Sequence, residues 1–304
     1  MRRSALPLLV VVLPLAAQPV FRGGVALVQV DVQVLKDRRP VEALKAGDFV
    51  IRENGQVRAV ENLGYESEPV DVVLLVDTSG SMRKTIAELA EGARTALAQL
   101  QSQDRAALML FAETSKVVQP LTSDRSAILS ALAQIISVAG ETDLYGAASA
   151  AAAYLEEYSR SEGRRAVLMI SDNLGPRTRP EQLVVGRFWI ANAVFNDLIT
   201  PTPFDASLLP PEWRPSKKSI ADMSLIVGAT GGEIVHLDGN AAAGLGRLLE
   251  RMRQRYSVYY RPAPGRAGEQ RTISVELSKT VKKQLGKVDI RARHGYILPA
   301  DVGE

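Results

Sequence analysis

Residues 72–81, with the sequence VVLLVDTSGS, decide the fold. Five consecutive aliphatic residues followed by an acid and a run of hydroxyl residues are typical of a strand that is buried on both faces and ends in a polar loop. From Met82 to Gln101 the apolar residues recur at steps of three and four, which is the spacing of one face of an amphipathic helix. The stretch therefore predicts a strand-loop-helix unit in an open α/β sheet.

The loop after this strand is the first candidate site. An open α/β sheet binds its ligand at the carboxyl ends of its strands, so Asp77, Ser79 and Ser81 are expected to face a ligand. One carboxylate and two hydroxyls are hard oxygen donors, which suit Mg²⁺, Mn²⁺ or Ca²⁺ rather than zinc. From these residues alone, the alternative that Asp77 and Ser79 only cap the helix stays open.

Two further stretches also place polar residues beside a predicted helix or at the end of a buried strand. Residues 140–147, GETDLYGA, form a polar loop before an alanine-rich helix, and residues 166–172, AVLMISD, form a second buried strand that ends in an acid. With these stretches the chain resembles the von Willebrand factor type A domain and its metal-ion-dependent adhesion site, which is written D-x-S-x-S, then T, then D on three loops. The resemblance implies a doubly wound, mostly parallel sheet flanked by helices. It assigns the metal site to Asp77, Ser79, Ser81, Thr142 and Asp172.

The resemblance also implies how this site works. Ser79, Ser81 and Thr142 would contact the ion directly or through one water, while Asp77 and Asp172 would bind the surrounding waters or hydroxyls. A carboxylate from a protein partner would then complete the metal shell. The chain departs from the family at residue 173, where Asn replaces the common Gly. Asn tolerates the left-handed backbone, so the turn is expected to survive. Asp143, beside the site, is expected to cap the following helix rather than bind the ion.

The composition of the chain excludes several kinds of ligand and metal site. The chain has 304 residues, 46% of them hydrophobic, with a formal net charge of +3 that gives no general affinity for nucleic acid. Cysteine is absent, which excludes disulfides and thiolate metal sites, and two histidines are too few for a histidine-based zinc site.

The first residues predict export. Residues 1–17 combine a basic start, a short apolar run and small residues at the end, which is the pattern of a secretory signal peptide. The run is too short to span a bilayer, so no stable membrane span is expected after cleavage. The alternatives are an uncleaved anchor or a buried N-terminal strand. The mature protein is expected in the periplasm or outside the cell.

Strand-like segments occupy both ends of the chain. Residues 18–66 are expected to form a β-rich module, in which Asn54-Gly55 marks a hairpin. Residues 70–261 are assigned to the type A domain, and residues 262–304 to further strands that pack with the N-terminal module. Both ends resemble those of bacterial VWFA-related proteins. The fold expected is thus an α/β domain plus a small β-rich domain built from the N- and C-terminal segments.

Three segments are less clear. Residues 188–195 are expected to be a strand with little room for a helix before it. The proline-rich residues 201–215 are expected to be an irregular loop, which either lines the site or is a surface excursion held by its aromatic residues. Residues 251–294 hold twelve Lys or Arg and three acids, and are read as a solvated strand face or, alternatively, a patch for an acidic partner or anionic lipid.

The function that these residues predict is an exported, divalent-cation-dependent protein-binding module and not an enzyme. A magnesium-dependent phosphoryl-transfer enzyme is the main alternative, because such sites also begin with an aspartate after a buried strand. That chemistry needs a second acid two residues later, where this chain has Ser79. A third possibility is an envelope scaffold in which the ion is purely structural.

Overall fold

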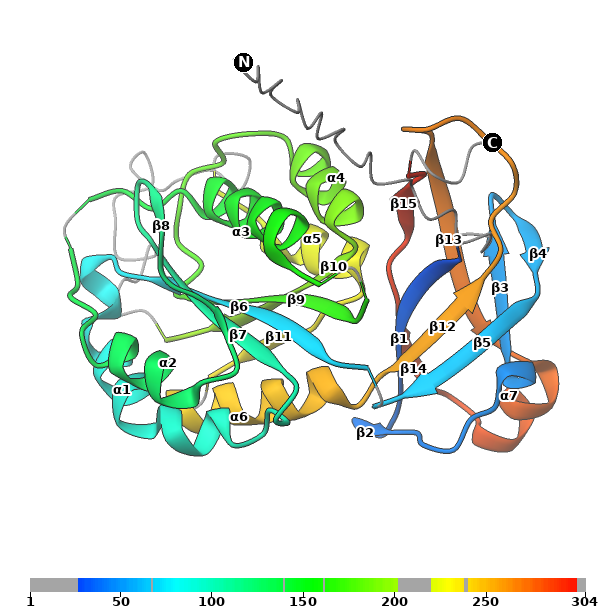
Figure 1. Ribbon diagram of the computed structural model, residues 1–304, viewed down its shortest axis with the longest axis horizontal. Coiled ribbons are helices and arrows are strands. Elements are labelled where there is room, and N and C mark those ends of the chain that lie inside the picture. Colours follow the sequence, from blue (N-terminus) through cyan, green and yellow to red (C-terminus); the bar gives the residue numbers. More distant parts are fainter. Residues whose placement is uncertain are drawn as a thin grey trace, which may run out of the picture.

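The computed structural model describes residues 27–66, 68–138, 140–160, 162–201, 220–237 and 240–299. In this part of the chain an α/β domain and a β-rich domain lie side by side (Figure 1). None of its helices is long and apolar enough to cross a membrane. The expected signal peptide and residues 202–215 of the proline-rich segment lie outside the described residues.

A six-stranded sheet forms the centre of the α/β domain. Its strands, in the order β11-β10-β9-β6-β7-β8, pair in parallel, except that β7 and β8 are antiparallel. All eight residues of β6 are buried, because β6 has strands on both sides and helices on both faces. The strands span Val70–Asp77 (β6), Arg105–Phe111 (β7), Ser115–Thr122 (β8), Arg164–Ser171 (β9), Ala193–Ile199 (β10) and Ile234–His236 (β11).

Helices cover both faces of this sheet. The alternation of side chains along β6 directs Val72, Leu74 and Val76 into one core and Val73 and Leu75 into the other. The first core is closed by α1 (Arg83–Leu97), α2 (Arg125–Leu132) and α6 (Ala241–Arg253), and the second by α3 (Leu144–Tyr158), α4 (Glu181–Ala191) and α5 (Met223–Thr230). This doubly wound sheet confirms the fold predicted for the central part of the chain.

Both ends of the chain build the β-rich domain. The N-terminal strand β1 pairs with β12, and β3 pairs with β13, all antiparallel. One sheet has the order β14-β1-β12-β5 with β2 beside β1, and the other has the order β15-β13-β3-β4. The strands span Val28–Lys36 (β1), Arg39–Pro40 (β2), Phe49–Glu53 (β3), Gln56–Arg58 (β4), Val60–Tyr65 (β5), Tyr256–Tyr260 (β12), Gln270–Leu277 (β13), Asp289–Arg291 (β14) and Gly295–Ile297 (β15).

This arrangement confirms the expected β-rich domain, including its hairpin, but differs from the expectation at β12 and at α7. The hairpin at Asn54-Gly55 forms between β3 and β4, and both turn residues have positive φ, as a tight hairpin turn requires. Strand β12 pairs with β1 and β5, although the expected limit at residue 261 placed it with the α/β domain. A short helix, α7 (Lys279–Leu285), lies where no helix was expected.

Two expected elements of the α/β domain are wrong. Residues 188–195 are not one strand: α4 ends at Ala191, Asn192 adopts a left-handed conformation, and β10 begins at Ala193. The sequence also favours a helix from a cap at Asp124 through Val138, but α2 ends at Leu132. The residues that follow return to the first loop, where the backbone N–H of Val138 donates to the Thr78 carbonyl at 2.7 Å.

Arginines link the two domains. Arg164 of β9 pairs with Asp31 of β1 at 3.1 Å, and Arg253 pairs with Asp104 at 2.6 Å while donating to the Glu66 carbonyl at 2.6 Å. The interpretation of the basic C-terminal region as a solvated face is therefore wrong for its buried members, which donate mainly to backbone carbonyls and carboxylates. These are Arg253, Arg255, Arg271 and Arg293.

Candidate functional site

The first loop of the candidate site follows β6. Asp77 is fully buried at the end of this strand, and one carboxylate oxygen, Oδ1, accepts the backbone N–H of Ser79 at 2.8 Å. The hydroxyls of Ser79 and Ser81 lie 3.2 Å apart. Ser79 is buried and Ser81 is exposed, so this group of three oxygen-bearing side chains extends from the interior to the surface.

Helix capping does not explain these residues. Met82 occupies the N-cap position of α1 and makes no side-chain capping bond. Ser79 precedes the short 3₁₀ turn Gly80–Met82 and makes no capping bond through its side chain either. The alternative that Asp77 and Ser79 serve only as caps is therefore contradicted by the hydrogen bonds.

The second loop carries Thr142 and leads into α3. Thr142 is buried, and the next residue, Asp143, donates its backbone N–H to the Ala112 carbonyl at 2.9 Å, which fixes this loop beside the end of β7. The Asp143 carboxylate accepts the Gly146 N–H at 2.8 Å and pairs with Arg179 at 2.8 Å. Asp143 is thus the helix cap that the sequence predicts.

The third loop follows β9. Asp172 is buried, and its Oδ1 accepts the backbone N–H of Leu174 at 3.1 Å. Asn173 has a φ of 57°, so it adopts the left-handed conformation expected of a residue in place of glycine. A Cβ on Gly175 would lie 2.6 Å from the Thr142 carbonyl oxygen, which shows that the third loop packs directly against the second.

Electrostatics connect the first and third loops. Burial raises the pKa of Asp77 to about 6, the hydrogen bonds from Ser79 oppose this shift, and the negative charge of Asp172 raises the pKa further. Within the described residues neither carboxylate forms an ion pair, and no group of three or more His, Cys, Asp or Glu gathers at one point. Two acids and three hydroxyls therefore make up the donor set, rather than a cluster of carboxylates.

The structure brings the three loops to the same edge of the sheet but leaves the metal assignment a prediction. Ser79 contacts Ser81, the Asp172 charge reaches Asp77, and Gly175 contacts the Thr142 backbone. No hydrogen bond within the described part of the chain joins Thr142 to the first loop. The other carboxylate oxygen of Asp77, Oδ2, is buried and has no hydrogen-bond partner among the described residues, so a bound cation or its water would satisfy it.

Two residues that support the first loop were not predicted. The hydroxyl of Ser137 donates to the Ser79 carbonyl at 3.0 Å, and Thr78 donates through its hydroxyl to the Phe111 carbonyl at 2.9 Å. Ser137 lies in a stretch expected to be helical, so nothing in the sequence pattern connected it with the loop.

The central part of the chain is similar to a known family. Residues 72–175 match the family model of the von Willebrand factor type A domain. A von Willebrand factor type A structure from Catenulispora acidiphila is 12% identical over 85% of this chain and 76% of that chain, with a TM-score of 0.48. An aerotolerance-related membrane protein from Bacteroides fragilis is 16% identical over 60% of this chain and 98% of that chain, with a TM-score of 0.46. No curated protein matches the sequence.

Proposed function

We propose, from the premise that residues 72–175 form a von Willebrand factor type A domain, that this protein is an exported module that binds a partner protein through a divalent cation. Domains of this family serve protein interaction and adhesion. The proposal adds the metal dependence and the export to that general role. It includes no enzymatic activity.

The observation that carries the proposal is the environment of Asp77. Its carboxylate is fully buried, lies within the influence of a second carboxylate on another loop, and has one oxygen without a hydrogen-bond partner in the described part of the chain. Buried charges normally have a counter-ion, and here no described basic side chain pairs with Asp77 or Asp172. A hard cation with its waters would neutralise both acids.

The donor set supports Mg²⁺, Mn²⁺ or Ca²⁺. Ser79, Ser81 and Thr142 would hold the ion through their hydroxyls, and Asp77 and Asp172 would accept hydrogen bonds from the hydroxyls and waters around it. When bound, the ion would offer a coordination position to a carboxylate of the partner. Because Ser81 is exposed while Asp77 is buried, the partner would approach from the side of Ser81.

Thermal denaturation with and without cation tests the metal site. Saturating Mg²⁺ or Mn²⁺ is expected to raise the melting temperature above that in EDTA, because the ion binds the folded state preferentially. Asp172→Ala is expected to abolish this rise. Asp143→Ala, which removes the neighbouring helix cap, is expected to lower the melting temperature but keep the rise. A cation response that survives in Asp172→Ala would contradict the assignment.

A second experiment separates a bridging ion from a structural one. The protein immobilised on a resin would be exposed to an envelope extract in Mg²⁺ and in EDTA, with Asp77→Asn as the control. A partner retained only in Mg²⁺ and only by the unaltered protein supports the proposal. A partner retained equally after chelation, from a protein whose melting temperature falls in EDTA, would show that the ion only stabilises the fold.

A further inference from the structure

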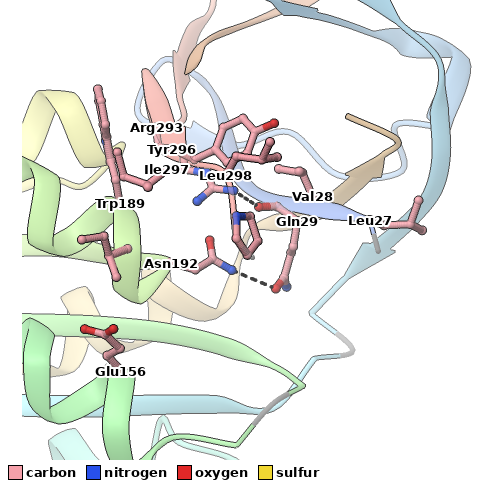
Figure 2. Close-up of a pocket in the computed structure, with 12 residues that line it drawn as sticks. Leu27, Val28, Gln29, Glu156, Trp189, Asn192, Arg293, Tyr296, Ile297 and Leu298 are labelled. Carbon is pink, nitrogen blue, oxygen red and sulfur yellow. Dashed lines mark hydrogen bonds between the residues drawn. The ribbon is translucent and has the colours of Figure 1, made fainter. Parts of the chain in front are cut away.

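A groove between the two domains lies at the opposite edge of the α/β sheet from the three loops. Its cavity has a volume of about 520 Å³ and is bordered by the end of α4, the start of β1 and residues 293–299. Figure 2 shows Trp189, Asn192 and Arg293 around this space. Helix α4 ends just before β10 begins, so the groove faces the amino ends of the parallel strands, away from Asp77 and Asp172.

One wall of the groove is apolar and rigid. The indole N–H of Trp189 donates to the Ala229 carbonyl at 3.1 Å, which fixes the ring, and Gly295 lies so close that a Cβ there would be 2.7 Å from the ring. Ile190 is 44% exposed and Leu27 is 40% exposed beside it. Large apolar side chains left exposed at a groove between domains indicate a surface that receives apolar groups.

Arg293 supplies the charge in the groove. The side chain is nine-tenths buried, its Nη2 donates to the Gln29 carbonyl at 2.6 Å, and its guanidinium lies 5.4 Å from the centre of the Tyr296 ring. Within the described residues it has no carboxylate partner, and its Nε has no hydrogen-bond partner. Burial lowers the pKa of Arg293, and the negative charge of Asp31 opposes this shift, but Asp31 is itself paired with Arg164 at 3.1 Å. Glu156 at the rim lies 4.0 Å from Arg187.

Most of the other buried arginines have an acidic partner. Arg164, Arg253 and Arg271 each pair with an acid, at 3.1, 2.6 and 3.3 Å. Arg255, which does not line the groove, donates to the Gly231 carbonyl and, like Arg293, pairs with no acid among the described residues. A buried cation without a counter-ion is costly, and an anion that enters the groove would relieve that cost. The groove is therefore complementary to a group that combines a carboxylate with apolar side chains.

Two strand edges border the same groove. Strand β1 pairs with β12 along Val28–Val32 but with β14 only along Gln33–Leu35, and β15 pairs with β13 alone among the described strands. Gln29 of β1 and Ile297 of β15 both line the cavity. Exposed strand edges bind extended peptides through backbone hydrogen bonds, while neighbouring pockets select the side chains.

We propose that this groove binds an extended segment of a partner protein, in which an acidic side chain pairs with Arg293 and flanking aliphatic or aromatic side chains pack against Trp189, Ile190 and Leu298. The site requires no metal and is separate from the three loops. The protein would thus have two protein-binding surfaces at opposite edges of its α/β sheet.

Selection from a phage-displayed library of random linear peptides, carried out in EDTA, tests this proposal. The enriched peptides are expected to share an Asp or Glu between apolar residues and to shift the indole N–H resonance of Trp189. Replacing the acid by its amide in a synthetic copy is expected to weaken binding by roughly tenfold or more, because the buried guanidinium loses its counter-ion.

Matched variants of the protein locate the binding site. Ile190→Glu places a like charge in the groove and is expected to weaken binding of the selected peptide by roughly tenfold or more. Leu183→Glu, at a 64% exposed position on the same helix outside the groove, is expected to leave the affinity unchanged. Arg293→Lys is expected to retain more affinity than Arg293→Met, with folding checked by circular dichroism.

Three results would overturn the proposal. The first is a selection that enriches no peptide, or only peptides without an acid. The second is equal affinity for the unaltered protein and Ile190→Glu. The third is binding that appears only with Mg²⁺ and disappears in Asp77→Asn, which would place the peptide at the three loops instead.

Discussion

Asp77 and Asp197 are both fully buried aspartates of the central sheet, but their surroundings differ. Asp77 accepts a hydrogen bond from Ser79 and lies within the influence of Asp172, at the edge where ligands bind. Asp197 lies within β10, neither of its carboxylate oxygens has a hydrogen-bond partner among the described residues, and burial alone raises its pKa, to about 7. The residue types of the candidate metal site could be selected from the sequence. The burial of Asp197 could not be predicted, because the sequence around a single acid in a strand does not show whether its side chain faces the core or the solvent.

The raised pKa of Asp77 predicts a pH-dependent stability in the absence of cation. Because the folded-state pKa is about 6 and the unfolded value about 3.8, the stabilising contribution of the protonated group is complete below pH 4 and lost as the pH rises to 6. The shift of about two pKa units corresponds to roughly 3 kcal/mol. Asp77→Asn in EDTA is therefore expected to gain stability relative to the unaltered protein between pH 4 and 7.

Urea denaturation at several pH values measures this difference. The comparison at pH 4 serves as an internal control, since the Asp77 carboxyl is then protonated in the folded protein. A variant whose stability, relative to the unaltered protein, is the same at pH 4 and pH 7 would contradict the environment described for Asp77.

The raised pKa of Asp197 predicts a second loss of folding stability as the pH rises. Its folded pKa of about 7 lies above the unfolded value of 3.8, so the favourable contribution of the protonated form is lost between pH 4 and 7. The difference corresponds to roughly 4 kcal/mol. Asp197→Asn is expected to remove this part of the slope, whatever its own constant cost. An unchanged slope in the same urea titration would show that Asp197 ionises freely in the folded protein.

At the scale of the element, the spacing of apolar residues predicted the helices that bury one face and the strands that are buried on both faces. Strand β6 and helix α1 follow their patterns because one is buried all round and the other has one polar side. Helix α4 was missed because it lacks a polar side: Val184 and Phe188 face the core, while Ile190 borders the groove between the domains. A helix with apolar residues on several sides gives no helical period, and its aromatic residues favour a strand.

The contact between α1 and α6 predicts opposite effects of one substitution on two facing helices. A Cβ on Gly92 would lie 2.0 Å from the Cβ of Ala242, whereas a Cβ on Gly246 would meet Ala96 at an ordinary 3.5 Å. Gly92→Ala is expected to cost roughly 1–3 kcal/mol through overpacking, partly offset by helix propensity. Gly246→Ala is expected to gain up to about 1 kcal/mol.

Chemical denaturation of the two variants, side by side, checks this difference. The substitution is identical in both, so a shared effect on the unfolded state cancels. Equal free energies of unfolding for Gly92→Ala and Gly246→Ala would mean that the helices are not packed as closely at Gly92 as the structure has them.

At the scale of the whole molecule, the chain leaves and re-enters the β-rich domain around the α/β domain. Strand-like patterns at both ends of the chain suggested that N-terminal and C-terminal strands pair with each other. The structure confirms this in the pairs β1–β12 and β3–β13. The sequence did not reveal the contacts that join the domains, since charged residues are usually solvent-facing. Arg164 and Arg253 are instead buried and bind carboxylates and carbonyls across the boundary.

The pair between Asp31 and Arg164 is expected to stabilise both domains together. The exposed fractions of these side chains are 12% and 3%, so Asp31→Ala would leave a buried cation unpaired and is expected to cost roughly 3 kcal/mol. Asp289→Ala removes an acid that is 56% exposed from its pair with Arg291 and is expected to cost less than about 1 kcal/mol. Scanning calorimetry measures both. Similar losses for the two variants would indicate that Arg164 does not depend on Asp31.

The most direct test of the central claim is the anomalous scattering of Mn²⁺ in crystals of the protein. The claim is that the loops carrying Asp77, Thr142 and Asp172 together hold one hard cation. It predicts a manganese peak bonded to the hydroxyls of Ser79 and Ser81, next to Thr142, and no such peak in crystals of Asp172→Ala. Crystals saturated with Mn²⁺ that show no peak at these loops, or a peak only elsewhere, would contradict it.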